Sequence, residues 1–126
     1  MNSPAFPFPL PGLDAAVVAR LVQLDPSGRL GVMRRIFSTY ETTARRLGEQ
    51  LEAQRQARQP EELVRSVHSL KSSSGSIGAL GLQRCCQQLE GRVRSGERID
   101  WDAEIDAVES ELAIVLASVR AMLATL

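Results

Sequence analysis

Apolar residues recur every three or four positions from residue 13 onward, and this spacing predicts amphipathic helices. The first stripe is short and stops at Asp25-Pro26, where proline disfavours a continuing helix. Its apolar positions are Leu13, Val17, Leu21 and Leu24. Residues 1–12 differ, because four prolines within them exclude a helix and predict an extended arm or linker.

Four longer stripes follow. The second helix is expected to be capped by Ser27 and to bury Leu30, Met33, Phe37, Tyr40, Ala44, Leu47 and Leu51. The third begins at Pro60, with acidic residues in its first turn, and buries Leu63, Val67, Leu70, Ser74 and Ile77. After a break near Gly78, the fourth helix presents Leu82, Cys85, Cys86, Leu89 and Val93, and ends around Ser95-Gly96. The last helix starts near Asp100 and carries Trp101, Ile105, Val108, Leu112, Val115, Val119, Met122 and Leu126.

This order of elements predicts an all-α fold, an up-and-down antiparallel four-helix bundle with a short additional N-terminal helix. The bundle should span residues 13–126 as one domain. A coiled-coil dimer is the competing architecture, because the stripes repeat every seven residues. Short connections and several separate stripes favour a bundle within one chain, so we expect a monomer, with dimerisation left open.

The charge balance and the lengths of the apolar stretches argue against some classes of protein. Fifteen basic and fifteen acidic residues cancel, which argues against a general nucleic-acid binder. The charges are unevenly spread, since 29–58 carries seven Arg against three Glu and 97–120 carries seven acids against two Arg. These segments could steer a partner or be ordinary solvated helix faces. No apolar stretch reaches the roughly 20 residues of a membrane span, and no signal peptide is visible, so we expect a cytoplasmic protein.

The candidate chemistry lies on the third helix. With Leu63 at zero and about 100° per residue, the buried stripe falls within about 40°, and His68 lies near 140°, facing outward. The neighbours of His68 on this outer side are Val64, Lys71, Ser72 and Gly75. His68 and Lys71 are the only histidine and the only lysine of the chain, and they lie on adjacent turns.

Such a face suits phosphoryl transfer. A neutral imidazole is a nucleophile near neutral pH, and a cation one turn away can attract the phosphoryl group. Glycine and serine leave room for the close approach of a partner. A surface histidine with a nearby lysine also occurs in helical proteins without this role, and Gly75 and Gly78 could simply mark a helix end.

The run from His68 to Glu90, HSLKSSSGSIGALGLQRCCQQLE, resembles the histidine-containing phosphotransfer (HPt) domains of bacterial multistep phosphorelays. The matching positions are His68, Lys71, Ser72–Ser74, Gly75, Ile77, Gly78, Leu82 and Leu89-Glu90. Ser72 is a departure, since the family most often has Gly there. The motif covers about 23 residues, and the helix pattern over 13–126 also agrees with the family.

The resemblance implies a carrier that relays a phosphoryl group between receiver-domain aspartates and has no nucleotide site of its own. His68 would be the phosphoacceptor and Lys71 would support the phosphoryl group. Val64, Ser72, Gly75 and Gly78 would contact the receiver domains of response regulators or hybrid sensor kinases, which supply the aspartate and Mg²⁺. No cofactor or metal site of the chain itself is expected.

Two other functions stay open. The dimerisation domain of a sensor histidine kinase typically has an acidic residue after its histidine and soon a proline, whereas Ser69 follows here. A helical scaffold or adaptor without phosphotransfer would share the fold, and only the local motif argues against it. Serine-hydrolase and phosphate-loop motifs are absent, and Cys85 and Cys86 are expected to be packing residues.

Overall fold

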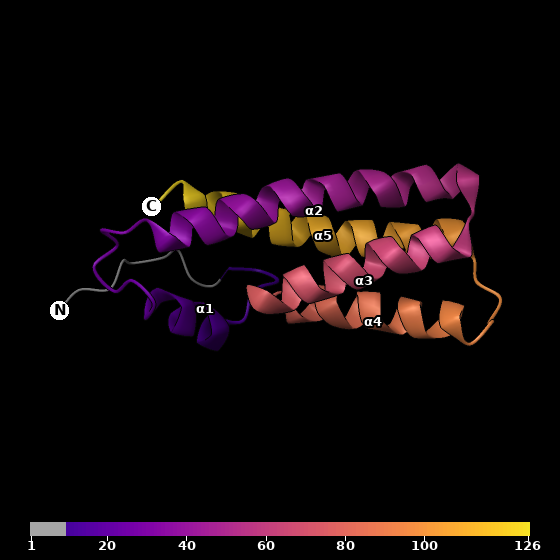
Figure 1. Ribbon diagram of the computed structural model, residues 1–126, viewed down its shortest axis with the longest axis horizontal. Coiled ribbons are helices and arrows are strands. Elements are labelled where there is room, and N and C mark those ends of the chain that lie inside the picture. The colour runs from indigo at the N-terminus through magenta and orange to yellow at the C-terminus, as the bar shows by residue number, and fades with distance from the viewer. Residues whose placement is uncertain (1–9) are drawn as a thin grey trace.

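The computed structural model describes residues 10–126 and contains five helices, with no strand within that range. The helices are α1 (Ala15–Val22), α2 (Val32–Ala57), α3 (Pro60–Ser76), α4 (Leu80–Arg94) and α5 (Trp101–Leu123). Helices α2 to α5 run antiparallel in sequence order, and α3 packs on α4 while α2 packs on α5 (Figure 1). The predicted up-and-down bundle with an additional short N-terminal helix is confirmed.

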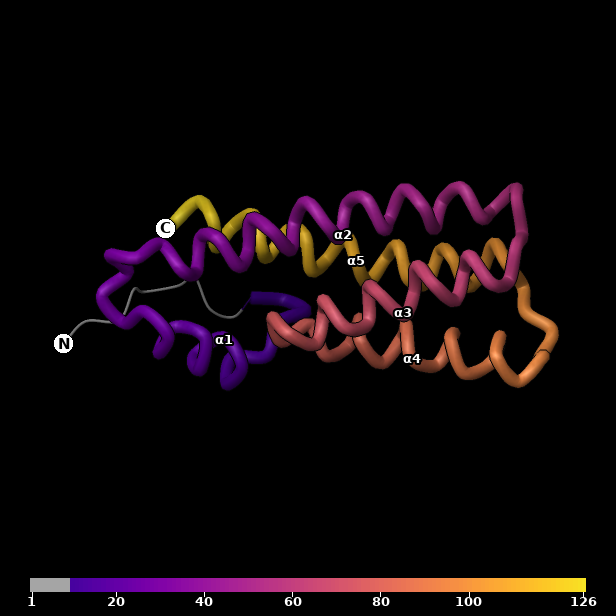
Figure 2. Tube along the Cα trace, viewed as in Figure 1, coloured from indigo at the N-terminus to yellow at the C-terminus, as the bar shows by residue number. Residues whose placement is uncertain are grey.

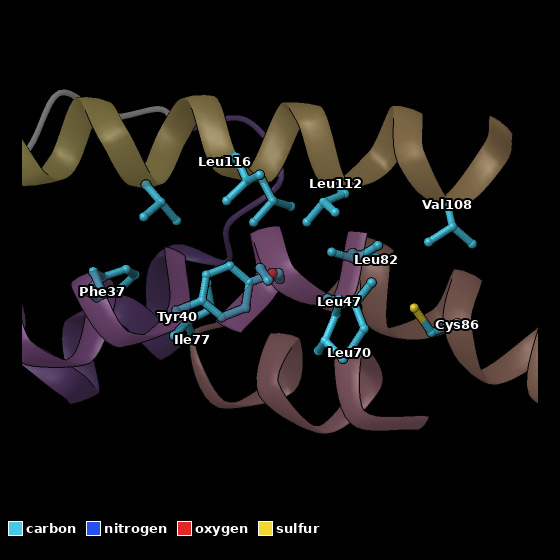
Figure 3. Packing of buried hydrophobic residues seen from close by; sticks show 14 of the residues in the cluster. Phe37, Tyr40, Leu47, Leu70, Ile77, Leu82, Cys86, Val108, Leu112 and Leu116 are labelled. Carbon is cyan, nitrogen blue, oxygen red and sulfur yellow. The ribbon is translucent and has the colours of Figure 1, made fainter. Parts of the chain in front are cut away.

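The core lies between these four helices and follows the predicted stripes closely. All five inward positions predicted for α3 are buried, including the polar Ser74. The hydroxyls of Ser74 and Tyr40 lie 2.9 Å apart in a buried hydrogen bond, which satisfies both groups. Figure 3 shows side chains from α2, α3, α4 and α5 meeting in this core. Cys86 is buried there and Cys85 only partly, so the predicted packing role fits Cys86 best.

Most helix ends lie where the sequence predicts them. Pro60 occupies the first turn of α3, followed by two glutamates near the positive end of the helix. Asp100 caps α5 by accepting a hydrogen bond from the backbone N–H of Ala103 at 3.1 Å. α4 ends at Arg94, immediately before Ser95-Gly96.

The predicted start of α2 is wrong. Ser27 does not cap the helix, which begins five residues later at Val32, and Leu30 is 67% exposed in the preceding loop. The buried carboxylate of Asp25 instead accepts hydrogen bonds from the backbone N–H groups of Leu30 and Val32. The acceptor near the start of α2 is therefore the Asp25 carboxylate and not the predicted Ser27 hydroxyl, and it holds the loop compact.

The predicted stripe of α1 is also misplaced by one position. The buried side chains are Val18 and Val22, whereas Val17 and Leu21 are only partly buried. Leu24 lies beyond the helix end and is 61% exposed. A helix of eight residues offers two turns, too few for its periodicity to distinguish neighbouring faces.

α1 closes one end of the bundle. α3 and α4 have 17 and 15 residues against 26 and 23 in α2 and α5, so the shorter pair stops before the bundle does. α1 lies beyond the α3–α4 turn and fills this remaining length (Figure 2). Leu10 is buried and Ser118 donates a hydrogen bond to the Pro11 carbonyl at 2.5 Å, so the last residues of the predicted arm pack on α5. The rest of that arm, residues 1–9, lies outside the described residues.

Candidate functional site

His68 lies on the outer face of α3, and its side chain is 52% exposed. This is the position that the helical periodicity predicts, off the edge of the buried stripe. The ring is in contact with α4, and α3 and α4 lie side by side in the bundle (Figure 1). A partner can therefore reach the imidazole, while α4 can supply groups that hold it.

The group that holds His68 is Glu90 of α4. One oxygen of its carboxylate lies 2.8 Å from His68 Nδ1, and the other accepts a hydrogen bond from Lys71 Nζ at 2.8 Å. Arg94, one turn further along α4, contacts the first oxygen through Nε at 3.0 Å. The Glu90 side chain is only 8% exposed, so three basic side chains surround a nearly buried carboxylate.

The electrostatics of this cluster keep Glu90 ionised. Burial acts to raise the pKa of its carboxyl group, but hydrogen bonds from Lys71 and His68 and their positive charges together outweigh it. The net effect lowers the pKa of Glu90 from its ordinary 4.5 to about 2. At neutral pH the carboxylate carries no proton and can only accept hydrogen bonds.

This ionisation assigns the tautomer of His68. Because Glu90 can only accept, the ring nitrogen in contact with it must carry the proton, so Nδ1–H donates to Glu90. In the neutral ring the lone pair then resides on Nε2. The arrangement orients the imidazole and leaves Nε2, with its lone pair, as the ring atom that could act as a nucleophile.

The other site residues predicted from sequence fall into two groups. Val64 is half-buried and Ser72 is exposed on α3, beside His68 and Lys71. Gly78 is buried, with φ of 84°, and its carbonyl accepts a hydrogen bond from the Asp14 backbone N–H at 2.8 Å. Gly78 therefore ends α3 and binds the start of α1, and it presents no open surface of its own.

Gly75 has a neighbour that sequence analysis did not identify. A Cβ atom placed on Gly75 would lie 2.2 Å from Nε2 of Gln83 in α4. The space left by the missing side chain is thus occupied by an amide of the same chain. The predicted role of Gly75, leaving room for a partner, has to be reconsidered with Gln83 in place.

Sequence reasoning assigned no role to Glu90 or Arg94, although Glu90 ends the recognised motif. The signal was present in the periodicity of α4, where Glu90 lies about 80° from Leu82, at the edge of the buried stripe. A carboxylate there, with arginine four residues later, marks a charged edge facing the neighbouring helix. Within residues 10–126, no group of three or more His, Cys, Asp and Glu side chains could hold a metal ion.

Comparisons with known proteins identify the family of the chain. The model of the Hpt domain family matches residues 35–122. Among solved structures, the chain is similar to histidine-containing phosphotransfer protein B from Pseudomonas aeruginosa PAO1, with 29% sequence identity and a TM-score of 0.76. That match covers 87% of this chain and 92% of the other. No curated protein matches the chain. With most of the bundle matched by the family model, the chain belongs to the Hpt domain family of histidine phosphotransfer proteins.

Proposed function

We propose that His68 accepts a phosphoryl group from the aspartyl phosphate of one receiver domain and passes it to the aspartate of another. The observation that carries this proposal is the contact between Nδ1 of the exposed His68 and the ionised Glu90. It fixes a nucleophilic nitrogen on the outer face of a helix, where a second protein can reach it. The family implies phosphotransfer, and this contact supports His68 as the acceptor.

The transfer step follows from the tautomer. Nε2 of His68 attacks phosphorus, so an N–P bond forms while the O–P bond to the receiver aspartate breaks and its carboxylate leaves. The ring keeps its proton on Nδ1 and gains positive charge, which Glu90 stabilises across 2.8 Å. Return transfer to a second aspartate reverses these bond changes.

Lys71 has a double role in this proposal. Its ammonium group binds Glu90 and lies one turn from His68, where it can also interact with the incoming phosphoryl oxygens. Val64 and Ser72 line the same outer face and would contact the receiver. The receiver contributes its own aspartate and Mg²⁺, so the chain acts as a carrier rather than as a complete enzyme.

Two further features complete the proposal. The four long helices bury their apolar stripes against one another, so we expect the carrier to be a monomer, and sedimentation or light scattering would measure its mass. Both cysteines are free thiols, as expected for a relay operating in the cytoplasm. In the described part of the chain, no helix is long and apolar enough to cross a membrane.

The test is phosphorylation by a receiver domain that already carries phosphate. Wild type should acquire an acid-labile, base-stable label, and His68→Gln should acquire none. Lys71→Ala should be labelled about tenfold more slowly, as expected for the loss of one charge-assisted hydrogen bond. Arg65→Ala is the matched control, because Arg65 lies three residues before His68 as Lys71 lies three after, and it pairs with Glu62 instead.

The opposite result would favour the scaffold function. If the folded wild-type protein takes no label from any receiver of the same cell, the carrier function is wrong. Circular dichroism of each variant should show wild-type helix content, so that a missing label reports on chemistry and not on unfolding.

A further inference from the structure

The contact between Gly75 and Gln83 repeats the geometry of the contact between His68 and Glu90. Gly75 follows His68 by seven residues on α3, and Gln83 precedes Glu90 by seven residues on α4. Since the two helices run antiparallel, both pairs belong to one register along the contact between α3 and α4. Gln83 therefore lies on the same edge of α4 as Glu90, two turns from it.

The Gln83 amide lies against α3 at Gly75 and forms no hydrogen bond with another residue of the described chain. Gln50 and Gln54 both form hydrogen bonds through their side chains, to Ser66 and to the backbone N–H of Gln59. Across residues 10–126, the half-buried Gln83 amide has no hydrogen-bond partner and rests against Gly75. Its two N–H donors and its carbonyl are available to a group outside the chain.

The Gln83 amide is close enough to His68 to lie within the interface of a partner that binds there. Two helical turns separate Gly75 from His68, which corresponds to about 10 Å along α3. A standard protein interface buries about 800 Å² on each partner, equivalent to a disc of about 16 Å radius. A receiver centred on the imidazole therefore covers Gln83.

We propose that Gln83 is a docking residue for the receiver domain, and that Gly75 acts in docking through Gln83 by leaving the space in which its amide lies. This inference rests on the proposed function, because it assumes a receiver on His68. The amide would donate to or accept from the receiver surface, two turns away from the reacting atoms. A methyl group at position 75 would expel the amide, and the backbone of α3 could remain unchanged because the displaced atoms end a flexible side chain.

The experiment measures the rate of phosphoryl transfer to His68 as a function of receiver concentration. Gln83→Ala should raise the receiver concentration for half-maximal rate about three- to tenfold, as expected for one lost hydrogen bond, and leave the saturating rate unchanged. Gly75→Ala should raise it similarly. Gln88→Ala is the matched control, an exposed glutamine of α4 on another face of the helix, and it should behave as wild type.

The double variant separates this inference from its rival. If Gly75 acts through Gln83, then Gly75→Ala/Gln83→Ala should equal Gln83→Ala alone, because the same contact is lost. If the fold-changes of the two single variants multiply in the double variant, the methyl group obstructs the receiver directly and the proposal is wrong. A wild-type concentration dependence for Gln83→Ala would also overturn it. Failure of wild type to accept any label would instead overturn the proposed function, and this inference with it.

Discussion

At the scale of single residues, the carboxylate of Glu90 links the stability of the bundle to its chemistry. It is nearly buried, yet it stays ionised because Lys71, His68 and Arg94 surround it. The same contact that fixes the His68 tautomer therefore has a free energy that depends on pH. Its two partners on α3 are the residues for which we propose a role in phosphotransfer.

This linkage predicts an acid-sensitive term in stability. The folded-state pKa of Glu90, about 2, is below its ordinary 4.5, so its ionisation stabilises the fold above about pH 4.5, and this contribution disappears as the pH falls toward 2. Urea unfolding across this range should show a steeper loss of stability for wild type than for Glu90→Gln. Glu97→Gln, which removes an exposed carboxylate, should keep the wild-type slope. Parallel slopes for wild type and Glu90→Gln would contradict the prediction.

The sequence predicted which site residues lie together only where those residues belong to the same helix. His68, Lys71 and Ser72 share a face of α3, so their spacing sufficed to place them together. Glu90 and Gln83 come from α4, and their contacts with α3 depend on the register between two helices. Periodicity gives the face of a helix and not its axial alignment with a neighbour, so these contacts required the structure.

At the scale of elements, the helices of the bundle were predictable and the segment around α1 was not. Long stripes average over several turns, so α3 and α5 begin within a residue of their predicted starts. The conformation of the segment from α1 to α2 depends on single polar contacts, such as the hydrogen bonds that the Asp25 carboxylate accepts from the backbone N–H groups of Leu30 and Val32. No periodic pattern reports such contacts.

Gly78 connects α1 to the bundle and gives a prediction at this scale. Its φ of 84° disfavours any residue with a side chain, and a Cβ there would lie 2.9 Å from Val17 Cβ. Gly78→Ala should therefore destabilise the fold by about 1–3 kcal/mol in denaturant unfolding. Gly91→Ala in α4, where a Cβ meets no atom within 4 Å, should instead stabilise by about 0.5–1 kcal/mol. Equal effects of the two substitutions would show that α1 is not held by this turn.

At the scale of the whole molecule, the uneven charge distribution is partly neutralised internally. The basic α2 and the acidic α5 pack side by side, and Arg55 contacts four carboxylates, those of Glu52, Asp102, Asp106 and Glu109. Arg120 of α5 pairs in the opposite sense with Glu41 of α2. The sequence left open whether these charges steer a partner or cover solvated faces, and the structure adds that several hold two helices together.

This network predicts a salt-dependent stability that is separate from phosphotransfer. Arg55→Ala removes the cation among four neighbouring acids, so the melting temperature should fall at low ionic strength, and the difference from wild type should shrink at about 0.5 M salt. Transfer to His68 at saturating receiver should be unchanged, since Arg55 of α2 pairs with Glu52 and with carboxylates of α5, and Glu90 is not among its partners. Arg45→Ala, an exposed arginine of the same helix, is the control. A change in the saturating rate would mean that the two helix pairs are coupled.

The short connection at Gly78 also limits how such sequences can change in length during evolution. Only residues 77–79 separate α3 from α4, so an inserted or deleted residue that lengthened or shortened either helix would rotate the partner positions by about 100° and shift them by about 1.5 Å. The His68–Glu90 and Gly75–Gln83 pairs would then be lost together, even though every residue of the motif remained. Residues 95–100, which join α4 to α5, are mostly exposed and lie at the opposite end of α4 from this turn. Length variation among descendants of this chain should therefore be tolerated in that loop and eliminated at the Gly78 turn.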